Sequence, residues 1–468
     1  MGLRPTRGRL VGMGMRLNAE TSAARLVGRL SRAVGRGGGT TLPGKLLWKV
    51  DPGALDALAA KLPAGVAIVS ATNGKTTTSA MLARVLGSRY RLAWNNSGAN
   101  LASGVASTLL SANEADLGLL EVDEFALPEV MQRVRPRVVS LGNLFRDQLD
   151  RYGELEHIAE RWRAAVARLP PTSTLVVNGD DPLVADLADG RAAALRFGVD
   201  DPRLARPALQ HAADSKYCIR CGEPYDYAAA YVGHLGDYRC PNCGHGRPAL
   251  DVVARSIDLQ ALDASVFDLV TPAGTVRVRL PLPGLYNVYN ALAAAASALA
   301  LDASLDEIAA GLGAFTAAFG RFERIEAGGR QILMLLIKNP AGANEAIRTL
   351  EEGGVPANLV IALNDRIADG RDVSWIWDVD FEPLLEGVER IVASGERAAE
   401  LALRFTYAGF PPERLEVIPE LRAALDRGLE LVPAGGELGL LPTYTAMLEL
   451  RQIAVSRGLV RPYWEGAS

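Results

Sequence analysis

The sequence has little of two features that would each point to a particular class of protein. Its apolar runs, of which 291–301 is an example, are much shorter than a membrane span, so we expect no transmembrane segment. Acidic and basic residues nearly balance, with a formal net charge of −4, which does not favour broad binding to nucleic acid. The sequence therefore predicts a cytoplasmic protein with no nucleic-acid partner.

The first 36 residues are an exception to this balance, because they carry eight arginines and one acid, Glu20. They contain no apolar core or small-residue cleavage site of the kind that marks a signal peptide. Two interpretations stay open for this basic N-terminal region, which we place at 1–44. It is either a surface helix with a frayed start or a basic helix that lies on anionic lipid headgroups at the inner face of the membrane.

Cysteine is also scarce, and all four cysteines fall in one short segment. Cys218 and Cys221 form one C-x₂-C pair, and Cys240 and Cys243 form the second. This spacing is typical of a zinc ribbon, which we place at 212–248, with four thiolates around a structural Zn²⁺. Disulfides are the alternative, but a cytosolic chain makes them less favourable. A finger that docks a protein or a nucleic acid is a second alternative, but the segment has few basic residues, which does not favour nucleic acid.

Residues 65–87 have the pattern of a buried strand, a tight loop and a helix. The loop carries Gly74, Lys75 and Thr76, which are the residue types of a phosphate-binding loop. Glycine lets the backbone approach phosphate, the lysine neutralises it, and the threonine hydroxyl ligates Mg²⁺. The usual pattern has glycine where this chain has Val69, but the placement between strand and helix still predicts ATP binding.

A second apolar run, 115–120, ends in Glu121, followed closely by Asp123 and Glu124. The carboxyl end of a parallel strand is where carboxylates meet a metal ion beside bound phosphate. We therefore predict Glu124 as the Mg²⁺ ligand, with Glu121 and Asp123 as alternates. A solvated acidic strand end is the other interpretation. Apolar runs that alternate with helical segments predict an α/β fold with a mostly parallel sheet.

Over 65–325 the chain resembles the Mur ligase superfamily in the order and spacing of these segments and of several later ones. The matching segments are 72–77, the strand that ends at Glu124, Asn143 with Asp147 and Asp150, Asn178 with Asp180 and Asp181, 284–294, and Gly320 to Glu323.

The resemblance implies a nucleotide site made by the loop and by two more distant residues. In that family the residue at Asn287 approaches the base and ribose, and the arginine at Arg321 reaches the phosphates. Capping of the following helix remains the alternative for Asn287. The implied ATP-binding set is Thr72, Asn73, Gly74, Lys75, Thr76, Thr77, Asn287 and Arg321, with Lys75 and Glu124 as catalytic groups.

The departures from the family pattern also carry information. Amino-acid-adding members usually have histidine where this chain has Gln148, and a carbamylated lysine in the helix that follows, whereas 154–169 contains no lysine. Their His-Asn-Pro turn is replaced by Lys338, Asn339 and Pro340. The loop lies within the first 76 residues, which leaves no room before it for the usual UDP-sugar domain.

Within the superfamily, the cysteine ribbon and the segment 364–380 resemble synthetase subunits that amidate lipid II. The resemblance implies ATP-dependent amidation of the D-glutamate α-carboxylate through an acyl phosphate, with ammonia from a GatD-type glutaminase. A separate glutaminase agrees with this chain, because all four of its thiols are predicted to bind metal and none is left to act as a nucleophile. In those complexes an aspartate of the synthetase completes the glutaminase triad. We predict Asp365 for this role, then Asp372 and Asp369, against the alternative of an acidic loop.

The predicted organisation is an ATPase domain over 45–325, interrupted by the ribbon, and a smaller C-terminal α/β domain over 326–468 that contacts the glutaminase. ATP is expected in the cleft between them. Two rival functions stay open. One is an amino-acid-adding ligase of the Mur or folylpolyglutamate type, and the other is a nucleotide-switched binding module.

Overall fold

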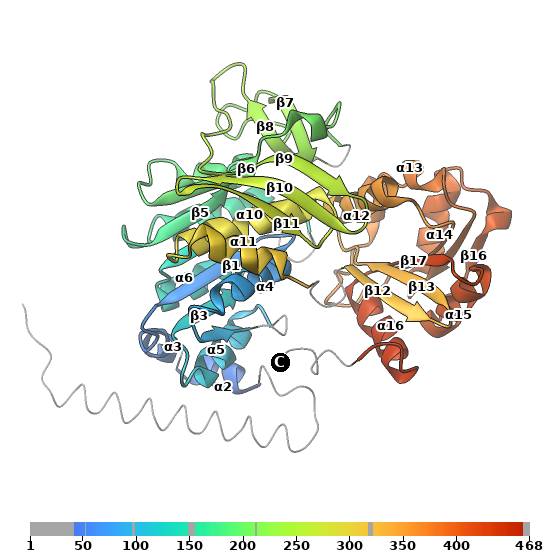
Figure 1. Ribbon diagram of the computed structural model, residues 1–468, viewed down its shortest axis with the longest axis horizontal. Coiled ribbons are helices and arrows are strands. Elements are labelled where there is room, and N and C mark those ends of the chain that lie inside the picture. The colour runs from blue at the N-terminus through green and yellow to red at the C-terminus, as the bar shows by residue number, and fades with distance from the viewer. Residues whose placement is uncertain are drawn as a thin grey trace, which may run out of the picture.

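The computed structural model describes residues 42–461 apart from 52, 96–98, 148–154, 211–212 and 317–321. The predicted N-terminal region is therefore almost wholly outside the described residues, as are Gln148, Asp150 and Arg321. The described chain forms two α/β units, each built on its own sheet, with a small hairpin on top of the first (Figure 1). In the described part of the chain no helix is long and apolar enough to cross a membrane.

The larger sheet has nine strands in the order β11-β10-β9-β6-β5-β4-β1-β3-β2. Strands β1 to β6 and β9 run parallel to their neighbours, while β10 and β11 extend one edge as an antiparallel meander. The strands are β1 (Val66–Ser70), β2 (Leu92–Trp94), β3 (Leu117–Glu121), β4 (Val138–Leu141), β5 (Thr174–Asn178), β6 (Ala194–Val199), β9 (Val252–Gln260), β10 (Ala264–Thr271) and β11 (Gly274–Leu280).

Both faces of this sheet are covered, which explains why its inner strands are apolar without alternation. On β1, Ala67 and Val69 face one hydrophobic core, and Val66 and Ile68 face the other. The first core includes α4 (Lys75–Leu86), α10 (Leu285–Leu299) and α11 (Leu305–Gly313). The second includes α2 (Leu42–Val50), α3 (Ala54–Ala59), α5 (Ala102–Ser111), α6 (Leu127–Val134), α8 (Leu155–Val166) and α9 (Pro182–Ala185), which leads into η1 (Asp186–Ala188).

The predicted zinc ribbon is a separate two-stranded element between β6 and β9. It consists of β7 (Asp226–Val232) paired antiparallel with β8 (Leu235–Arg239), and the cysteine loops flank the pair. The short helix η2 (Pro202–Leu204) lies before it. In Figure 1 the hairpin lies above strands β6 and β9 of the large sheet.

The second sheet has six strands in the order β12-β13-β17-β14-β15-β16, parallel except for the edge strand β12. On β14, Leu359 and Ile361 face one core while Val360 and Ala362 face the other. The strands are β12 (Phe322–Ala327), β13 (Arg330–Leu335), β14 (Asn358–Ala362), β15 (Arg390–Ser394), β16 (Leu415–Val417) and β17 (Glu437–Pro442). The helices are α12 (Pro340–Gly353), η3 (Ser374–Asp378), α13 (Glu382–Leu385), α14 (Ala398–Tyr407), η4 (Pro412–Arg414), α15 (Leu421–Leu431) and α16 (Tyr444–Ser456).

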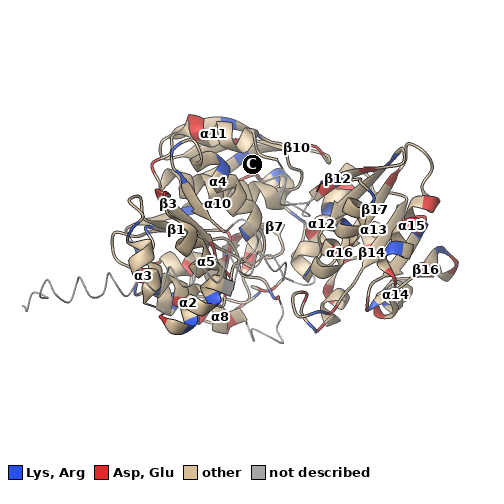
Figure 2. Cartoon of the chain, turned by 90° about the horizontal axis from the view of Figure 1, so that it is seen from below, with Lys and Arg blue, Asp and Glu red and all other residues tan. Residues whose placement is uncertain are grey.

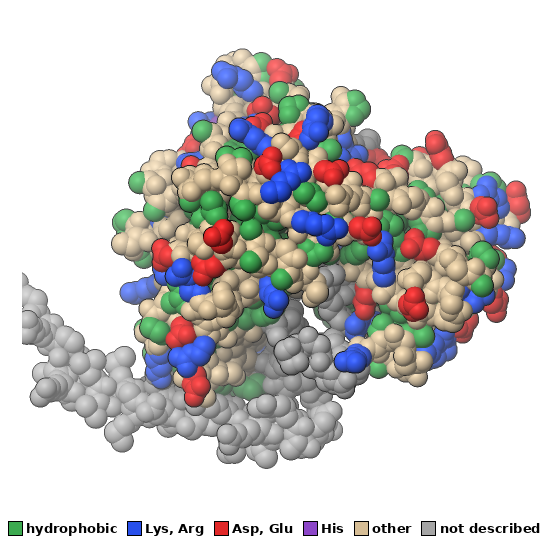
Figure 3. Space-filling view, viewed as in Figure 1, with side chains coloured by type: hydrophobic (Ala, Val, Ile, Leu, Met, Phe, Trp, Pro, Cys, Tyr) green, Lys and Arg blue, Asp and Glu red, His purple; other side chains and the backbone are tan. Residues whose placement is uncertain are grey.

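The α/β class with a parallel-rich sheet, predicted from the sequence, is therefore confirmed. The antiparallel meander at one edge is a feature that the strand-helix alternation did not predict. Acidic and basic side chains are interspersed over the faces in view (Figures 2 and 3).

Close packing of α11 against α4 fixes the helix that carries the phosphate-binding loop. A Cβ added to Gly311 would lie 2.7 Å from Val85 Cα, which is backbone and cannot move aside. We expect Gly311→Ala to destabilise the protein by about 1–3 kcal/mol, although alanine normally favours a helix. Thermal or urea unfolding measures this change.

The matched control is Gly313→Ala in the same helix. A Cβ there would meet its nearest neighbour, Arg279 O, at 3.6 Å, which is ordinary contact. This variant is expected to be neutral or slightly stabilising. Equal unfolding midpoints for the two variants would contradict the packing argument.

Candidate active site

The loop between β1 and α4 has the geometry of a phosphate-binding loop. Gly74 has a φ of 85°, and a Cβ on it would lie 1.9 Å from Asn290 Oδ1, so only glycine fits this position. The Lys75 ammonium folds back over the loop and donates to Ala71 O at 3.0 Å and Thr72 O at 3.4 Å. Helix α4 begins directly at this loop, and the N-terminus of a helix is where the motif binds phosphate.

Lys75 and Glu124 form a buried ion pair, with 3.0 Å between Nζ and Oε2. Glu124 is only 6% exposed. Burial is the largest single influence and opposes the charge on each group, but the opposite charges nearby outweigh it together: Glu124, Asp123 and Glu121 raise the pKa of Lys75, and Lys75 and Lys338 lower the pKa of Glu124. Both groups are therefore held in their charged forms at the edge of the loop.

The other predicted carboxylates lie in the same place. The Thr76 hydroxyl donates to Glu121 Oε1 at 2.9 Å, and Asp123 accepts the backbone N–H of Phe125 at 3.1 Å. The structure thus places the alternate ligand Glu121, rather than Glu124, against the Thr76 hydroxyl. Parallel pairing of β1 with β3 brings these groups together. Oxygen ligands in this arrangement suit Mg²⁺.

Asparagines join the loop to the C-terminal unit. Asn143 accepts the N–H of Asn73 at 2.9 Å and donates to its carbonyl at 3.0 Å. The side chains of Asn73 and Asn339 exchange hydrogen bonds of 3.2 and 3.1 Å, although 266 residues separate them. Asn339 also caps α12 by accepting the N–H of Gly342. The two units therefore meet directly at the loop.

Lys338 is a site residue to which the sequence analysis gave no role. Its ammonium donates to Asp147 Oδ2 at 2.6 Å and to Thr72 O at 3.0 Å. The carbonyl of Thr72 is therefore shared by two ammonium groups, that of Lys75 from the loop and that of Lys338 from the C-terminal unit. The replacement of histidine by lysine before Asn339 was the available signal, but nothing local indicated which carbonyl it would reach.

A cavity runs from the loop into the space between the two units. It encloses about 940 Å³ of empty space, part of which is open solvent. Asn73, Gly74 and Thr77 of the loop line it. The other lining residues include Phe145, Val232, Leu235, Leu282, Tyr286, Asn287, Phe322, Leu335, Lys338 and Glu345. Polar loop residues and apolar side chains in one lining suit phosphates and a base, respectively.

Asn287 lines this cavity, but its side chain is also engaged within α10. It donates to Pro283 O at 2.7 Å and accepts from Asn290 at 3.1 Å. The helix begins after Gly284 without a side-chain cap, so the capping alternative does not describe this asparagine. Thr72 is buried beside the loop, where its hydroxyl accepts the N–H of Phe145 at 3.1 Å. Arg321 lies outside the described residues.

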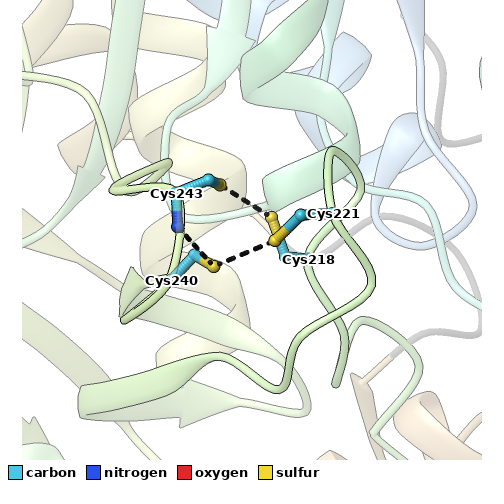
Figure 4. Close-up of side chains that lie close together, drawn as sticks. All are labelled: Cys218, Cys221, Cys240 and Cys243. Carbon is cyan, nitrogen blue, oxygen red and sulfur yellow. Dashed lines mark hydrogen bonds between the residues drawn. The ribbon is translucent and has the colours of Figure 1, made fainter.

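The four cysteines converge at the outer end of the hairpin (Figure 4). Their Sγ atoms lie within 4.8 Å of one another, and the closest pairs are 3.4 and 3.5 Å apart. A disulfide would need about 2.05 Å, whereas a tetrahedral ion with Zn–S bonds of about 2.3 Å separates its sulfurs by about 3.8 Å. Burial opposes the thiolate of Cys218, but backbone N–H groups of Arg220 and Cys221 lower its pKa to about 6. The donor set therefore fits Zn²⁺.

The three aspartates predicted to serve a partner follow β14 but lie in different surroundings. Asp365 is partly exposed and pairs with Arg397 at 3.0 Å, while Asp372 is exposed and accepts the N–H of Ser374 at 2.8 Å. Asp369 is only 7% exposed and binds the N–H and hydroxyl of Thr445. Asp365 and Asp372 are accessible to a partner, and Asp369 supports the fold of the loop.

A phosphate-binding loop on a nine-stranded sheet, facing a second α/β unit across a cavity, defines the fold of a Mur-type ligase. Residues 69–298 match the Mur ligase middle domain, and residues 336–447 match the MurT ligase C-terminal domain. Among solved structures, a pseudomurein peptide ligase type C from Methanothermus fervidus superposes with a TM-score of 0.68 at 22% identity, covering 86% of this chain and 80% of that one. A MurF ligase from Thermotoga maritima in complex with ADP gives a TM-score of 0.62 at 15% identity, with 89% and 85% covered.

Curated relatives narrow the class. The MurT subunit of lipid II isoglutaminyl synthase (glutamine-hydrolyzing) from Streptococcus pneumoniae is 34% identical over 453 residues, 95% of this chain and 99% of that protein. The protein of the same name from Staphylococcus aureus is 33% identical, covering 82% of this chain and 86% of its own length. The chain belongs to the MurT family.

The position of Lys338 gives a testable prediction about nucleotide binding. If phosphates occupy the loop, Lys338→Gln removes a charge beside the terminal phosphate, and a charged hydrogen bond contributes about 1.5–3 kcal/mol. We expect ATP to bind at least about tenfold more weakly, with a smaller effect on ADP. Isothermal titration calorimetry with each nucleotide measures both dissociation constants.

An exposed lysine on the ATPase unit provides the control. Lys61→Gln removes an equal charge from the surface and should leave both dissociation constants unchanged. If Lys338→Gln weakened ATP and ADP equally, the contact with the terminal phosphate would be wrong.

Proposed function

We propose that this chain is the ATP-dependent synthetase subunit that amidates the α-carboxylate of D-glutamate in the lipid II stem peptide. The observation that carries the proposal is the end-to-end similarity to a relative named for this reaction, together with the loop and cavity described above. The product would be D-isoglutamine in the peptidoglycan precursor.

The chemistry follows from the weak electrophilicity of a carboxylate. Attack of the carboxylate oxygen on the γ-phosphorus of ATP forms an acyl phosphate and releases ADP. Ammonia then adds to the carbonyl carbon, and the tetrahedral intermediate expels phosphate and loses a proton to give the amide. In the first step, Lys75 stabilises charge on the transferring phosphoryl group and on the leaving ADP.

ATP would lie in the cavity with its phosphates at the loop and its base against the apolar lining residues. The MurF ligase of similar fold that was crystallised in complex with ADP supports binding of an adenine nucleotide. Mg²⁺ would bind the Thr76 hydroxyl and Glu124, with Glu121 as the closest alternate. Glu124 would then pair with the ion instead of with Lys75, and the Lys75 ammonium would be available to bind phosphate. Arg321, predicted to reach the phosphates, is part of the same proposal.

Ammonia would come from a GatD-type glutaminase, because the free base is scarce at neutral pH and every cysteine of this chain lies in the metal cluster. The names of the relatives, which describe a glutamine-hydrolysing enzyme with subunits, support such a partner. We propose that Asp365 completes the partner's catalytic triad, with Asp372 as the alternate. The exposed pair Trp377 and Tyr407, whose rings are 5.5 Å apart, lies on the same unit and would contribute to its docking surface.

Two rival functions make different demands on the site. An amino-acid-adding ligase would need a site for an amino acid, because an amino acid replaces ammonia as the nucleophile. Those enzymes usually carry a carbamylated lysine in this helix, and 154–169 contains no lysine. A nucleotide-switched binding module would hydrolyse ATP slowly without an acceptor. The predicted domain limit between 325 and 326 falls within β12 (Phe322–Ala327), which pairs with β13 in the C-terminal sheet, so the C-terminal unit includes residues from 322 onward. The cytoplasmic location is part of the proposal.

The test is co-expression with the candidate glutaminase, followed by mass spectrometry of lipid II incubated with ATP, Mg²⁺ and glutamine. We expect the mass change of a hydroxyl replaced by an amino group. Lys75→Ala should lower the rate of amidation by more than about a hundredfold, because the variant loses a positioned charge that stabilises phosphoryl transfer. Incorporation of an added amino acid instead would support the rival ligase.

Asp365→Asn separates the two half-reactions. This variant should lose amidation from glutamine but keep amidation from added ammonium, because the synthetase site is intact. Asp372→Asn tests the alternate: if this variant loses the glutamine-dependent reaction and Asp365→Asn does not, the role belongs to Asp372. Loss of the ammonium-dependent reaction in Asp365→Asn would contradict the assigned role.

We also propose that the cysteine cluster holds one structural Zn²⁺, since four protein ligands leave no position for a substrate. Metal analysis of the purified chain should give about one zinc per chain, and Cys221→Ser should lower this content. A chain that purifies with no transition metal and unfolds normally would contradict the site.

A further inference from the structure

The tip of the zinc-ribbon hairpin lies inside the molecule, at the cavity between the two α/β units. The turn joining β7 to β8 places Val232 and Leu235 in the cavity lining, 4% and 1% exposed. These residues are at the end of the hairpin remote from the cysteines. The ribbon is therefore part of the cavity wall rather than an outlying module.

The tip is fixed on the ATPase side by close packing. His234 is fully buried, and its ring centroid lies 4.7 Å from that of Phe145, which also lines the cavity. Gly233 has a φ of 57°, and a Cβ there would lie 2.8 Å from Phe145 Cε1. The N–H of Gly236 donates to Asp180 O at 2.9 Å. A shift of the turn would therefore displace Phe145 as well.

The hairpin also contacts the C-terminal unit. Arg348 of α12 donates to Tyr231 O at 2.9 Å. Arg206, whose N–H donates to Ala230 O, pairs through its guanidinium with Glu345 of α12 at 3.2 Å, and Glu345 lines the cavity. The hairpin thus touches both units beside the cavity.

The far end of the hairpin runs directly into the metal ligands. Cys240 follows the last residue of β8, and Cys218 and Cys240 pack with Tyr225 and Tyr238 in a small separate core. Strand β7 has seven residues and spans about 20 Å, which links the cluster to the cavity. A two-stranded hairpin is marginally stable by itself, so this one depends on its ends.

We propose that the hairpin tip forms the wall of the nucleotide-base pocket, and that metal bound by the four cysteines sets nucleotide affinity by holding this wall in place. The inference rests on the proposed ATP site. Val232 and Leu235 act as affinity-determining contacts with the base, and the ribbon couples metal occupancy to ATP binding.

The first test measures ADP and ATP dissociation constants for Val232→Ala and Leu235→Ala by calorimetry. Lost apolar contact in a closed pocket should weaken both nucleotides by about tenfold and by the same factor, because both carry the same base. This pattern differs from the one expected for Lys338→Gln, which acts on the terminal phosphate.

The matched control is Val253→Ala on β9. Val253 is 6% exposed and does not line the cavity, so its truncation creates a comparable core defect away from the base. This variant should bind both nucleotides as the unchanged chain does, even if its unfolding midpoint falls. Wild-type affinity in both tip variants would overturn the base-pocket assignment.

The second test removes the metal by Cys221→Ser or by a chelator, with zinc content and ADP affinity measured on the same samples. We expect ADP affinity to fall at least about tenfold with the zinc content, and amide hydrogen exchange in 226–239 to accelerate. Zinc-free protein that binds ADP as tightly as zinc-loaded protein would overturn the coupling.

The outcomes separate this inference from the proposed function. If the unchanged chain binds ADP and needs Lys75 to bind ATP tightly, but the tip and zinc variants are normal, only the hairpin proposal fails. If the unchanged chain binds no adenine nucleotide, the proposed function fails, and the hairpin proposal with it.

Discussion

The buried ammonium of Lys75 is the constraint on which the site depends. A charge at 9% exposure must be paired, and Glu124, which follows the end of β3, pairs with it at 3.0 Å. Because β3 pairs with β1 in parallel, Glu121, Asp123 and Glu124 emerge beside the loop. The order of the central strands therefore determines which acids share the loop, and the same acids are suited to a metal ion.

The two units also meet at this loop. Asn339 binds Asn73, and Lys338 reaches Thr72, so the start of α12 lies against the phosphate-binding backbone. A change in the position of the C-terminal unit would move an ammonium group relative to the phosphates. The unit proposed to receive ammonia from a partner is thus mechanically connected to the site that would activate the acceptor.

The zinc ribbon adds a third part to this arrangement. Its cysteines lie at the periphery, but its turn lies between the ATPase sheet and α12. Small metal modules commonly stabilise a fold locally. Here the hairpin reaches from the cysteine cluster to the cavity, so metal bound by the cysteines would stabilise part of the cavity wall.

Much of the site could be predicted from local signals. The loop at Gly74 to Thr76, the acids after β3 and the C-x₂-C pairs are short patterns whose chemistry is contained in a few consecutive residues. Lys338, Val232 and Leu235 could not be found this way, because each reaches the cavity from a distant segment. Nor could the sequence show that Thr76 would contact Glu121 rather than Glu124. Both acids lie at the end of the same strand, and only side-chain geometry distinguishes them.

By itself, then, the sequence determined the α/β class, the phosphate-binding loop and the metal-ligand set, because strand, helix and knuckle patterns depend on neighbours along the chain. The tertiary structure alone decided which lysines share the Thr72 carbonyl, which asparagines join the two units and where the ribbon turn lies. Those contacts span up to 266 residues, and they form only when two independently folded sheets and an inserted hairpin bury a common cavity.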